Sequence, residues 1–241
     1  MPLPKIELPI YELTIPSTGV TIKVRPFTVK EEKLLLMAAE SKDANEIINT
    51  VKQVINNCVI DGVVDINKLP FFDIDYVFIF LRAKSVSDSV PMRMTCNNVL
   101  EDGSTCGNNF ESNMDISNAS LEKNDEISDD IKLDKINGVR MKYPNYSIVK
   151  YLEQAKDADK KTALIVNSIE YVYDKKGMHS SKDFSKDELK AFIEGLTEEN
   201  YKKLELFVDN FPTTVVNLEA DCPKCGFHHH VRYADFYDFF S

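Results

Sequence analysis

The chain has 241 residues, of which 43% are hydrophobic and 28% charged, and it carries a formal net charge of −10 at pH 7. This composition is typical of an ordinary soluble globular protein that can bury a substantial core, and it excludes fibrous and disordered classes. The acidic charge argues against a general nucleic-acid binder, because contacts to phosphates require a basic surface.

The apolar runs and the cysteines of the sequence predict whether the protein enters a membrane and in which compartment it is made. The longest strongly apolar run, Tyr76 to Leu81, is far shorter than a membrane-spanning helix. The opening MPLPKIELPI lacks the charged-then-apolar layout of a signal peptide. An odd number of cysteines, 5, without an export signal indicates a reducing compartment in which thiols bind metal or pack. We therefore expect a soluble protein that is cytosolic when made and has no membrane partner.

The N-terminal part predicts a β-hairpin followed by a capped helix. YELTI and VTIKV alternate apolar and polar residues with period two, and the residues between them are typical of a turn. Thr28 and Glu31 have the spacing of a capping box, in which the glutamate carboxylate accepts a hydrogen bond from the threonine amide. We expect a helix to follow, through Ala38.

Two more helices are predicted before residue 90. Asp43 marks the start of one, and the apolar residues after it form one stripe at helical spacing: Ile47, Val51, Val54, Ile55 and Cys58. Because Cys58 belongs to this stripe, we interpret it as a core thiol and not a reactive one. The other helix begins near Asp73 and is apolar on most sides, so we expect it to be buried centrally.

Strands are predicted after Val90. VPMRMTC alternates as a strand does, and CGNNFESNMDI does so more weakly. SLEKNDEISDD is acidic and poor in large apolar residues, which predicts a solvated connector. IKLDKINGVRMKY predicts a hairpin in which Asn137-Gly138 supplies positive φ in a tight turn.

A helical block is predicted from about Tyr146 to Phe211, and Pro212 closes it. Its apolar stripes comprise Ile165, Ile169 and Val172, and later Tyr201, Leu204, Phe207, Val208 and Phe211. Ser185 with Glu188 forms another capping box. TTVVNLEAD then returns to strand character.

These changes of periodicity predict an α+β fold in three parts. Residues 1–89 should form an N-terminal β-hairpin with helices. Residues 90–116 and 212–241 should form a split, zinc-ribbon-like β region. Residues 117–211 should form a hairpin and helical insertion between its two halves.

The cysteines other than Cys58 occur in two similar settings. Cys222 and Cys225 form a Cys-x-x-Cys pair, while Cys96 and Cys106 flank a longer loop. In both settings a strand leads to the first cysteine, and a glycine and a second strand follow the other. Such a glycine permits positive φ, so that backbone amides can point at thiolates. Because two such knuckles together supply a tetrahedral set of thiolates, the sequence predicts one structural zinc ion bound by these four cysteines.

Two other interpretations remain open at this stage. A thioredoxin-type redox pair requires Cys-x-x-Cys at the start of a helix, whereas the strand-like FHHHVRY follows here. The hairpins could instead hold reduced, packed thiols without metal. We interpret the three adjacent histidines as strand residues and not as ligands, with His228 and His230 on one face and His229 on the other.

Sequence signatures of catalysis are missing. The chain contains no P-loop, no GxGxxG, no GxSxG and no HExxH, and it has only 4 histidines. The aspartates and glutamates fit helix starts and exposed faces. We therefore expect neither an enzyme nor a small-molecule substrate.

Five stretches spread along the chain carry a resemblance to a known family: MPLPKIELPIYELTIPSTGVTIKVRPFTVKEEKLLLMA, VKQVINNCVIDGVVDINKLPFFDIDYVFIFLRAKSV, MKYP at 141–144, SKDELKAFIEGL at 185–196 and the closing YADFYDFF. They resemble the T4-type bacteriophage baseplate hub subunit family, which also includes a hub assembly protein. This resemblance implies a protein made late in infection that helps to build the hub at the centre of the contractile tail's baseplate. It assigns no functional residues, so the zinc prediction rests on this sequence alone.

Two classes of function follow. The first is a non-enzymatic bacteriophage tail protein, a baseplate hub subunit or hub assembly factor, which contacts other baseplate hub proteins. Its location would be the host cytoplasm during assembly and, if it stays in the virion, the tail baseplate. The alternative is a zinc-ribbon adaptor that binds host transcription machinery or nucleic acid. The net charge of −10 and the absence of Arg/Lys clusters near the knuckles favour the first class.

The C-terminal segment YADFYDFF, Tyr233 to Phe240, is rich in aromatic residues. Such residues are unfavourable in water and typical of interface anchors, so we expect the segment to contribute to a partner contact. The competing interpretation is that it folds back and completes the core of the knuckles.

Overall fold

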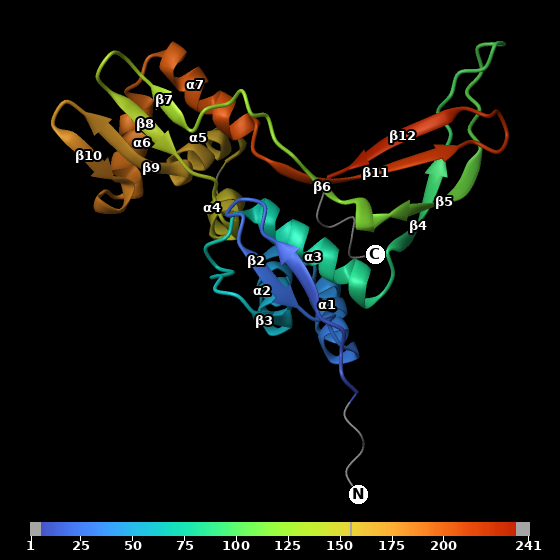
Figure 1. Ribbon diagram of the computed structural model, residues 1–241. Coiled ribbons are helices and arrows are strands. Elements are labelled where there is room, and N and C mark those ends of the chain that lie inside the picture. Colours follow the sequence, from blue (N-terminus) through green and yellow to red (C-terminus); the bar gives the residue numbers. More distant parts are fainter. Residues whose placement is uncertain (1–5, 155, 235–241) are drawn as a thin grey trace, which may run out of the picture. The chain divides into compact units, whose positions relative to one another are not determined.

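The computed structural model describes residues 6–154 and 156–234 (Figure 1). Helices and small antiparallel sheets alternate along these residues, which confirms the α+β class. None of the helices in this part of the chain combines the length and the apolar composition that crossing a bilayer requires. Residues 235–240 of the predicted C-terminal contact segment lie outside the described residues.

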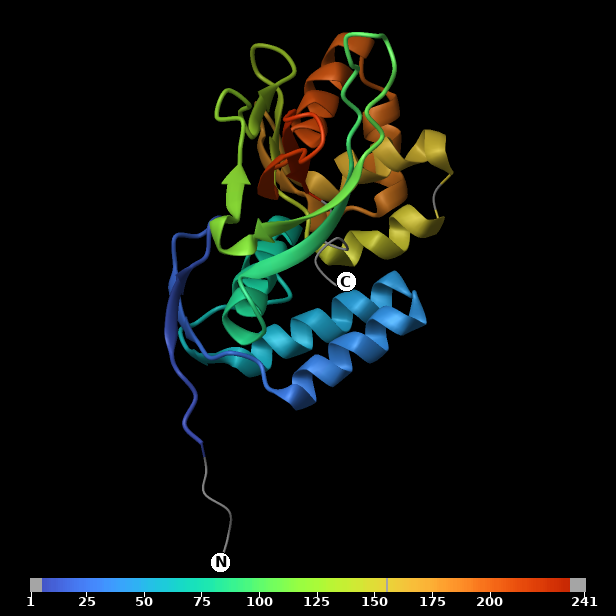
Figure 2. The same cartoon turned by 90° about the vertical axis from the view of Figure 1, so that its right-hand side faces the viewer.

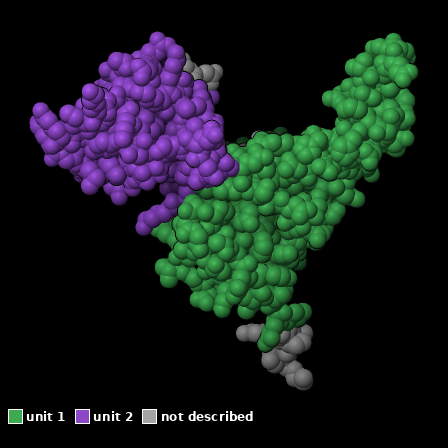
Figure 3. All heavy atoms as spheres, turned by 45° about the horizontal axis from the view of Figure 1, so that its top comes forward, with its two compact units in different colours: residues 1–66, 72–122, 213–241 green, residues 67–71, 123–212 purple. Residues whose placement is uncertain are grey.

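The chain forms two compact units (Figure 3). Unit 1 comprises residues 1–66, 72–122 and 213–241, and unit 2 comprises residues 67–71 and 123–212. The predicted division into residues 1–89, 90–116 with 212–241, and 117–211 stays a prediction.

Unit 1 begins with the predicted hairpin. Its sheet has the order β1-β2-β3, with β1 at Tyr11–Thr14, β2 at Thr21–Val24 and β3 at Val59–Asp61. Leu13 lies opposite Ile22 in the register, and both side chains are buried. The alternation of apolar and polar residues in β1 and β2 therefore corresponds to one buried face of the hairpin, as expected.

Three helices accompany this sheet: α1 at Val29–Ser41, α2 at Ala44–Cys58 and α3 at Phe71–Ser85. The Thr28 amide donates to Glu31 Oε2 at 2.7 Å, so the capping box is present. Helices α1 and α2 pack side by side (Figure 2). Cys58 is fully buried at the end of α2, which confirms it as a core residue, and α3 buries Phe72 and Phe78 as expected of a central helix.

The rest of unit 1 consists of two antiparallel ribbons and a short strand. In the first ribbon β4, at Ser89–Thr95, pairs with β5, at Asn109–Asp115. In the second ribbon β11, at Thr213–Asp221, pairs with β12, at His228–Tyr233, and the short strand β6, at Ser120–Glu122, pairs with the other edge of β11. We call β4, β5, β11, β12 and their connecting loops the β arm (Figure 1). A 3₁₀ turn, η1 at Ile116–Asn118, leads from β5 to β6.

The interior of the β arm is apolar. Strands β4, β5 and β11 each contribute buried residues that form one cluster with α3 and η1: Ile79, Val90, Met94, Met114, Ile116, Val216 and Leu218. Because alternate residues of each strand point into this cluster, the two ribbons pack face to face.

One segment of unit 1 departs from the prediction of a solvated connector. Residues Ser120–Glu122 form β6, which pairs with β11, and Leu121 lies opposite Thr214. A strand of this length is too short for alternation to be recognised, and its partner is distant in sequence. Hydrogen bonding along the edge of β11, and not local composition, determines its conformation.

Unit 2 contains a four-stranded sheet of order β10-β9-β8-β7 covered by helices. The strands are β7 at Asp130–Lys132, β8 at Gly138–Met141, β9 at Ile169–Asp174 and β10 at Gly177–Ser180. The helices are α4 at Val149–Gln154, α5 at Asp157–Ser168, α6 at Lys186–Glu194 and α7 at Glu198–Asp209, with 3₁₀ turns η2 at Tyr146–Ile148 and η3 at Ser181–Asp183. The Ser185 amide donates to Glu188 Oε2 at 2.8 Å at the start of α6, which confirms the capping box there.

The prediction of an uninterrupted helical block was wrong within unit 2. Ile165 lies in α5, but Ile169 and Val172 lie in β9, which pairs with both β8 and β10. The helical spacing of these three residues is coincidental, since β-branched residues suit a strand equally well. Pairing with strands from elsewhere in unit 2 decides the conformation.

The β7–β8 hairpin is present, but its turn differs from the expected one. Asp134 Oδ1 accepts hydrogen bonds from the amides of Ile136 and Asn137 in a wider loop. Neither Asn137 nor Gly138 has positive φ. Gly138 instead leaves room for the ring of Tyr173, because a Cβ there would lie 2.2 Å from it.

Candidate metal centre

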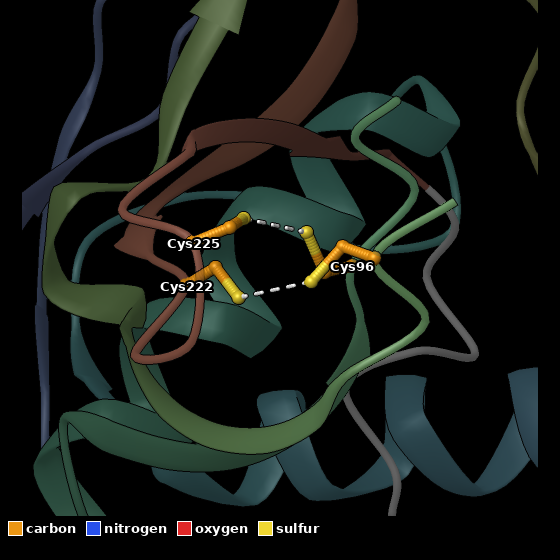
Figure 4. Close-up of side chains that lie close together, drawn as sticks. Cys96, Cys222 and Cys225 are labelled. Carbon is orange, nitrogen blue, oxygen red and sulfur yellow. Dashed lines mark hydrogen bonds between the residues drawn. The ribbon is translucent and has the colours of Figure 1, made fainter. Parts of the chain in front are cut away.

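The predicted metal ligands meet at the tip of the β arm. Cys96 directly follows β4 and Cys222 directly follows β11, while Cys106 and Cys225 come shortly before β5 and β12. We call residues 96–108 the first knuckle and residues 222–227 the second knuckle. The labelled side chains in Figure 4 turn their sulfur atoms toward a common centre. The four Sγ atoms all lie within 4.8 Å of one another.

The two knuckles share one backbone design despite their different loop lengths. The amide of the first cysteine donates to the carbonyl of the residue two positions after the second cysteine: Cys96 to Asn108 at 2.8 Å, and Cys222 to Phe227 at 2.9 Å. The glycine after the second cysteine donates back to the first cysteine's carbonyl, at 3.0 Å from Gly107 and 2.8 Å from Gly226. The repeated pattern supports the prediction that these are two versions of one motif.

Both glycines have the backbone conformation that the sequence predicts. Gly107 has φ of 61° and Gly226 has φ of 71°. This left-handed conformation is unfavourable for residues with a Cβ atom. It turns the backbone so that each knuckle closes on its own first cysteine.

The sulfur geometry fits a four-coordinate ion. Tetrahedral zinc with Zn–S bonds of about 2.3 Å separates its sulfur ligands by about 3.8 Å. Here Cys96 and Cys225 are 3.6 Å apart, and Cys106 and Cys222 are 4.0 Å apart (Figure 4). These separations are much longer than a disulfide bond of about 2.05 Å, and all four cysteines are free thiols. Four thiol donors around one point are the set typical of structural zinc.

The electrostatic environment favours thiolates in the second knuckle. Burial opposes ionisation of Cys222, but the amides of Cys225 and Lys224 outweigh it and lower the thiol pKa to about 6 from its ordinary value of 9.0. The amide of Phe227 likewise lowers the pKa of Cys225. In the first knuckle, burial raises the pKa of Cys96 to about 12. A cation at the centre would stabilise the thiolate of every ligand, since metal binding displaces the thiol protons.

Two side chains that were not predicted as part of the site complete this environment. Asn98 Nδ2 donates to Cys225 Sγ at 3.6 Å, and Asn108 Nδ2 donates to Cys222 Sγ at 3.7 Å. Each asparagine follows a cysteine of the first knuckle by two positions, and this repeat is a signal in the sequence. Both amides reach sulfur atoms of the other knuckle, so they join the two knuckles independently of any ion.

The three histidines alternate as predicted. His229 is buried beside Phe110 and Phe227, with ring centroids at 5.7 and 4.9 Å. His228 and His230 lie on the opposite, exposed face and contact Asp221 and Glu219. Their positions belong to strand β12 and not to the group of sulfur atoms.

The second knuckle differs from a thioredoxin-type redox site. Cys222 and Cys225 lie in a turn between strands β11 and β12. A helix N-terminus, whose dipole lowers the thiol pKa in that class, does not follow the pair. In this protein the local backbone amides described above lower the thiol pKa instead of a helix dipole, and two further thiols lie beside the pair.

Comparison with known proteins identifies the family. The family model described as T4 bacteriophage base plate protein matches residues 8–241, nearly the whole chain. Comparisons with curated proteins and with solved structures gave no significant match. The chain therefore belongs to the T4 bacteriophage base plate protein family.

Proposed function

We propose that this base plate protein acts at the hub of the baseplate, as a subunit or an assembly factor, without catalysis and through contacts with other hub proteins. The observation that carries the proposal is the family match over residues 8–241. The sequence stretches that resemble the hub subunits support a location at the hub within the baseplate. In this role the chain works in the host cytoplasm during assembly, and a subunit that stays would be found in the tail baseplate.

Zinc at Cys96, Cys106, Cys222 and Cys225 is part of the proposal, with a structural role. The four clustered thiols would occupy every position of a tetrahedral ion, which would leave no coordination position for a substrate or an activated water. Such an ion would join the two halves of the β arm at its tip. The arm could then keep one shape when it contacts a neighbouring protein.

The adaptor for transcription machinery or nucleic acid has no comparable support. The surface beside the second knuckle carries Glu219 and Asp221, which contact His230 and His228. These acidic groups would repel a phosphate backbone.

Affinity purification from infected cells tests the proposal. A tagged chain should recover baseplate hub proteins, and it should not recover host RNA polymerase. Mass spectrometry of purified phage then separates a hub subunit, present in the virion, from an assembly factor, which is absent. Recovery of polymerase without hub proteins would favour the adaptor and overturn the proposal.

A further inference from the structure

Unit 2 contains a basic pocket of about 740 Å³. Its polar lining includes side chains from separate parts of unit 2: Lys68, Lys142, Lys182, Lys186, Asn145 and Asn167. Lys142 directly follows β8, Lys182 lies in η3, and Lys186 is the first residue of α6. Glu170 is the acidic residue among the described residues that line the pocket. This pocket thus brings four lysine side chains together in a protein of net charge −10.

The lysines in the pocket are close enough to repel one another. Burial lowers the pKa of Lys142, the nearby Glu170 raises it, and the neighbouring Lys182 lowers it by a smaller amount than Glu170 raises it. Burial also lowers the pKa of Lys186, and so does Lys142. Among the described residues of unit 2, the ion pairs do not involve Lys142, Lys182 or Lys186. An anion in the pocket would relieve this repulsion.

Strand β10, beside the pocket, offers features that can bind an extended peptide. Tyr171, Met178 and Ser180 also line the pocket, and Tyr171 lies opposite Ser180 in the β9–β10 register. They provide an aromatic ring, an apolar chain and a hydroxyl on one sheet face. Strand β10 is at the edge of the sheet, so its outer backbone groups are available to an added strand.

We propose that this pocket binds acidic side chains of an extended segment of a partner base plate protein, which lies along β10. The inference rests on the proposed function in that it takes the partner to be a base plate protein. A peptide uses both features of the site: its carboxylates contact the lysines, and its backbone and remaining side chains contact the edge strand. Inorganic phosphate or a nucleic-acid backbone would use the lysines alone.

A direct binding assay on the full chain tests the pocket. The probe is a fluorescent, end-blocked octapeptide in which aspartate alternates with valine, and binding is measured by fluorescence anisotropy. A matched peptide with asparagine in place of aspartate is the control ligand. We expect the aspartate peptide to bind, and we expect the asparagine peptide to bind at least about tenfold more weakly. Several ion pairs, each of modest strength, together account for a difference of this size.

Two matched variants locate the binding. The first combines Lys142→Gln, Lys182→Gln and Lys186→Gln. The control combines Lys132→Gln, Lys135→Gln and Lys202→Gln, which remove the same charge from exposed positions of unit 2 outside the pocket and away from β10. The pocket variant should lose at least about tenfold in affinity, and the control should change by less than about twofold. Because lysine repulsion is removed, the pocket variant should melt at no lower a temperature than the wild type. If it melts lower, Lys182→Gln alone, at an exposed side chain, serves as the test variant.

Several outcomes would overturn the pocket assignment. These are failure of the wild type to bind the aspartate peptide, equal losses in both variants, or displacement of the peptide by millimolar inorganic phosphate or by a short DNA duplex. Purification of hub proteins with the wild-type chain is measured separately. Recovery of hub proteins without peptide binding would overturn only the pocket. Peptide binding without recovery of hub proteins would overturn only the proposed hub function.

Discussion

Cys96 Sγ and Cys225 Sγ lie 3.6 Å apart although 129 residues separate them in the chain. The intervening chain includes all of unit 2 except residues 67–71. Closing so long a loop costs conformational entropy, and a cross-link at its ends removes much of that cost from folding. A metal bound at these thiols would therefore stabilise the β arm more than its small size suggests.

The first prediction concerns metal content. The untagged protein, purified without chelators, should contain about one zinc per chain, because its four thiols lie close enough together to bind one tetrahedral ion. Cys222→Ser should lower both the zinc content and the melting temperature, since metal binding and folding are coupled. Elemental analysis and thermal unfolding measure the two effects.

Cys58→Ala is the matched control for that substitution. Cys58 is buried in α2 and is not among the clustered thiols, so this variant should keep its zinc even if it becomes less stable. Well under one zinc per wild-type chain would refute the zinc site. Equal loss of zinc from both variants would show that the metal is not bound by the four knuckle cysteines.

The second prediction concerns the knuckle glycines. Gly226→Ala should destabilise the protein by about 1 kcal/mol, because alanine is strained at positive φ. No other group lies within 4 Å of the added methyl, so the effect isolates the backbone conformation. Gly195→Ala, at a helix end with negative φ, is the control and should cost less. Chemical denaturation distinguishes them, and equal stability of wild type and Gly226→Ala would contradict the prediction.

The third prediction concerns Glu31. Its hydrogen-bonded ion pair with Arg25, at 2.8 Å, lowers the carboxyl pKa from 4.5 to about 2. A lowered folded-state pKa contributes stability that is fully present above the unfolded value of 4.5 and is lost as pH falls toward 2. After allowance for solvent screening, Glu31→Gln should cost about 1 to 2 kcal/mol at neutral pH.

The difference between wild type and Glu31→Gln should shrink as pH falls from 4.5 toward 2. Urea unfolding over this pH range measures it, and loss of metal at low pH affects both proteins alike. Glu32→Gln, on the next residue of α1, should show little effect at any pH. A constant gap between wild type and Glu31→Gln across the range would argue against the ion pair as its source.

The fourth prediction concerns the C-terminal aromatic segment. Truncation after Arg232 should leave the protein folded but abolish recovery of hub proteins, because large aromatic residues are typical interface anchors. Tyr233 packs against the core of the β arm, so truncation after Ala234 is a milder companion variant. Unfolding of both variants would assign the segment to the core instead. Full recovery of hub proteins by a folded truncation would exclude it from the interface.

Local signals in the sequence were sufficient for much of unit 1. The first hairpin, the Thr28–Glu31 capping box and the central position of α3 were predicted because each depends on residues close together in the chain. The clustering of four cysteines was also predictable. Strand, cysteine, glycine and strand recur in the same order in both knuckles, so the sequence itself suggested that they form one site.

The sequence therefore determined the α+β class, the first hairpin with its capped helix, and the set of cysteines that meet. Tertiary structure alone decided where β6 pairs, that β9 is a strand, and that the ring of Tyr173 lies close to Gly138. The first two depend on hydrogen bonds to strands distant in sequence. The lysine pocket has the same origin, because its charges come from segments that only the folded unit 2 brings together. Periodicity records which face of a segment is buried, but it does not record which distant backbone or charge will lie beside it.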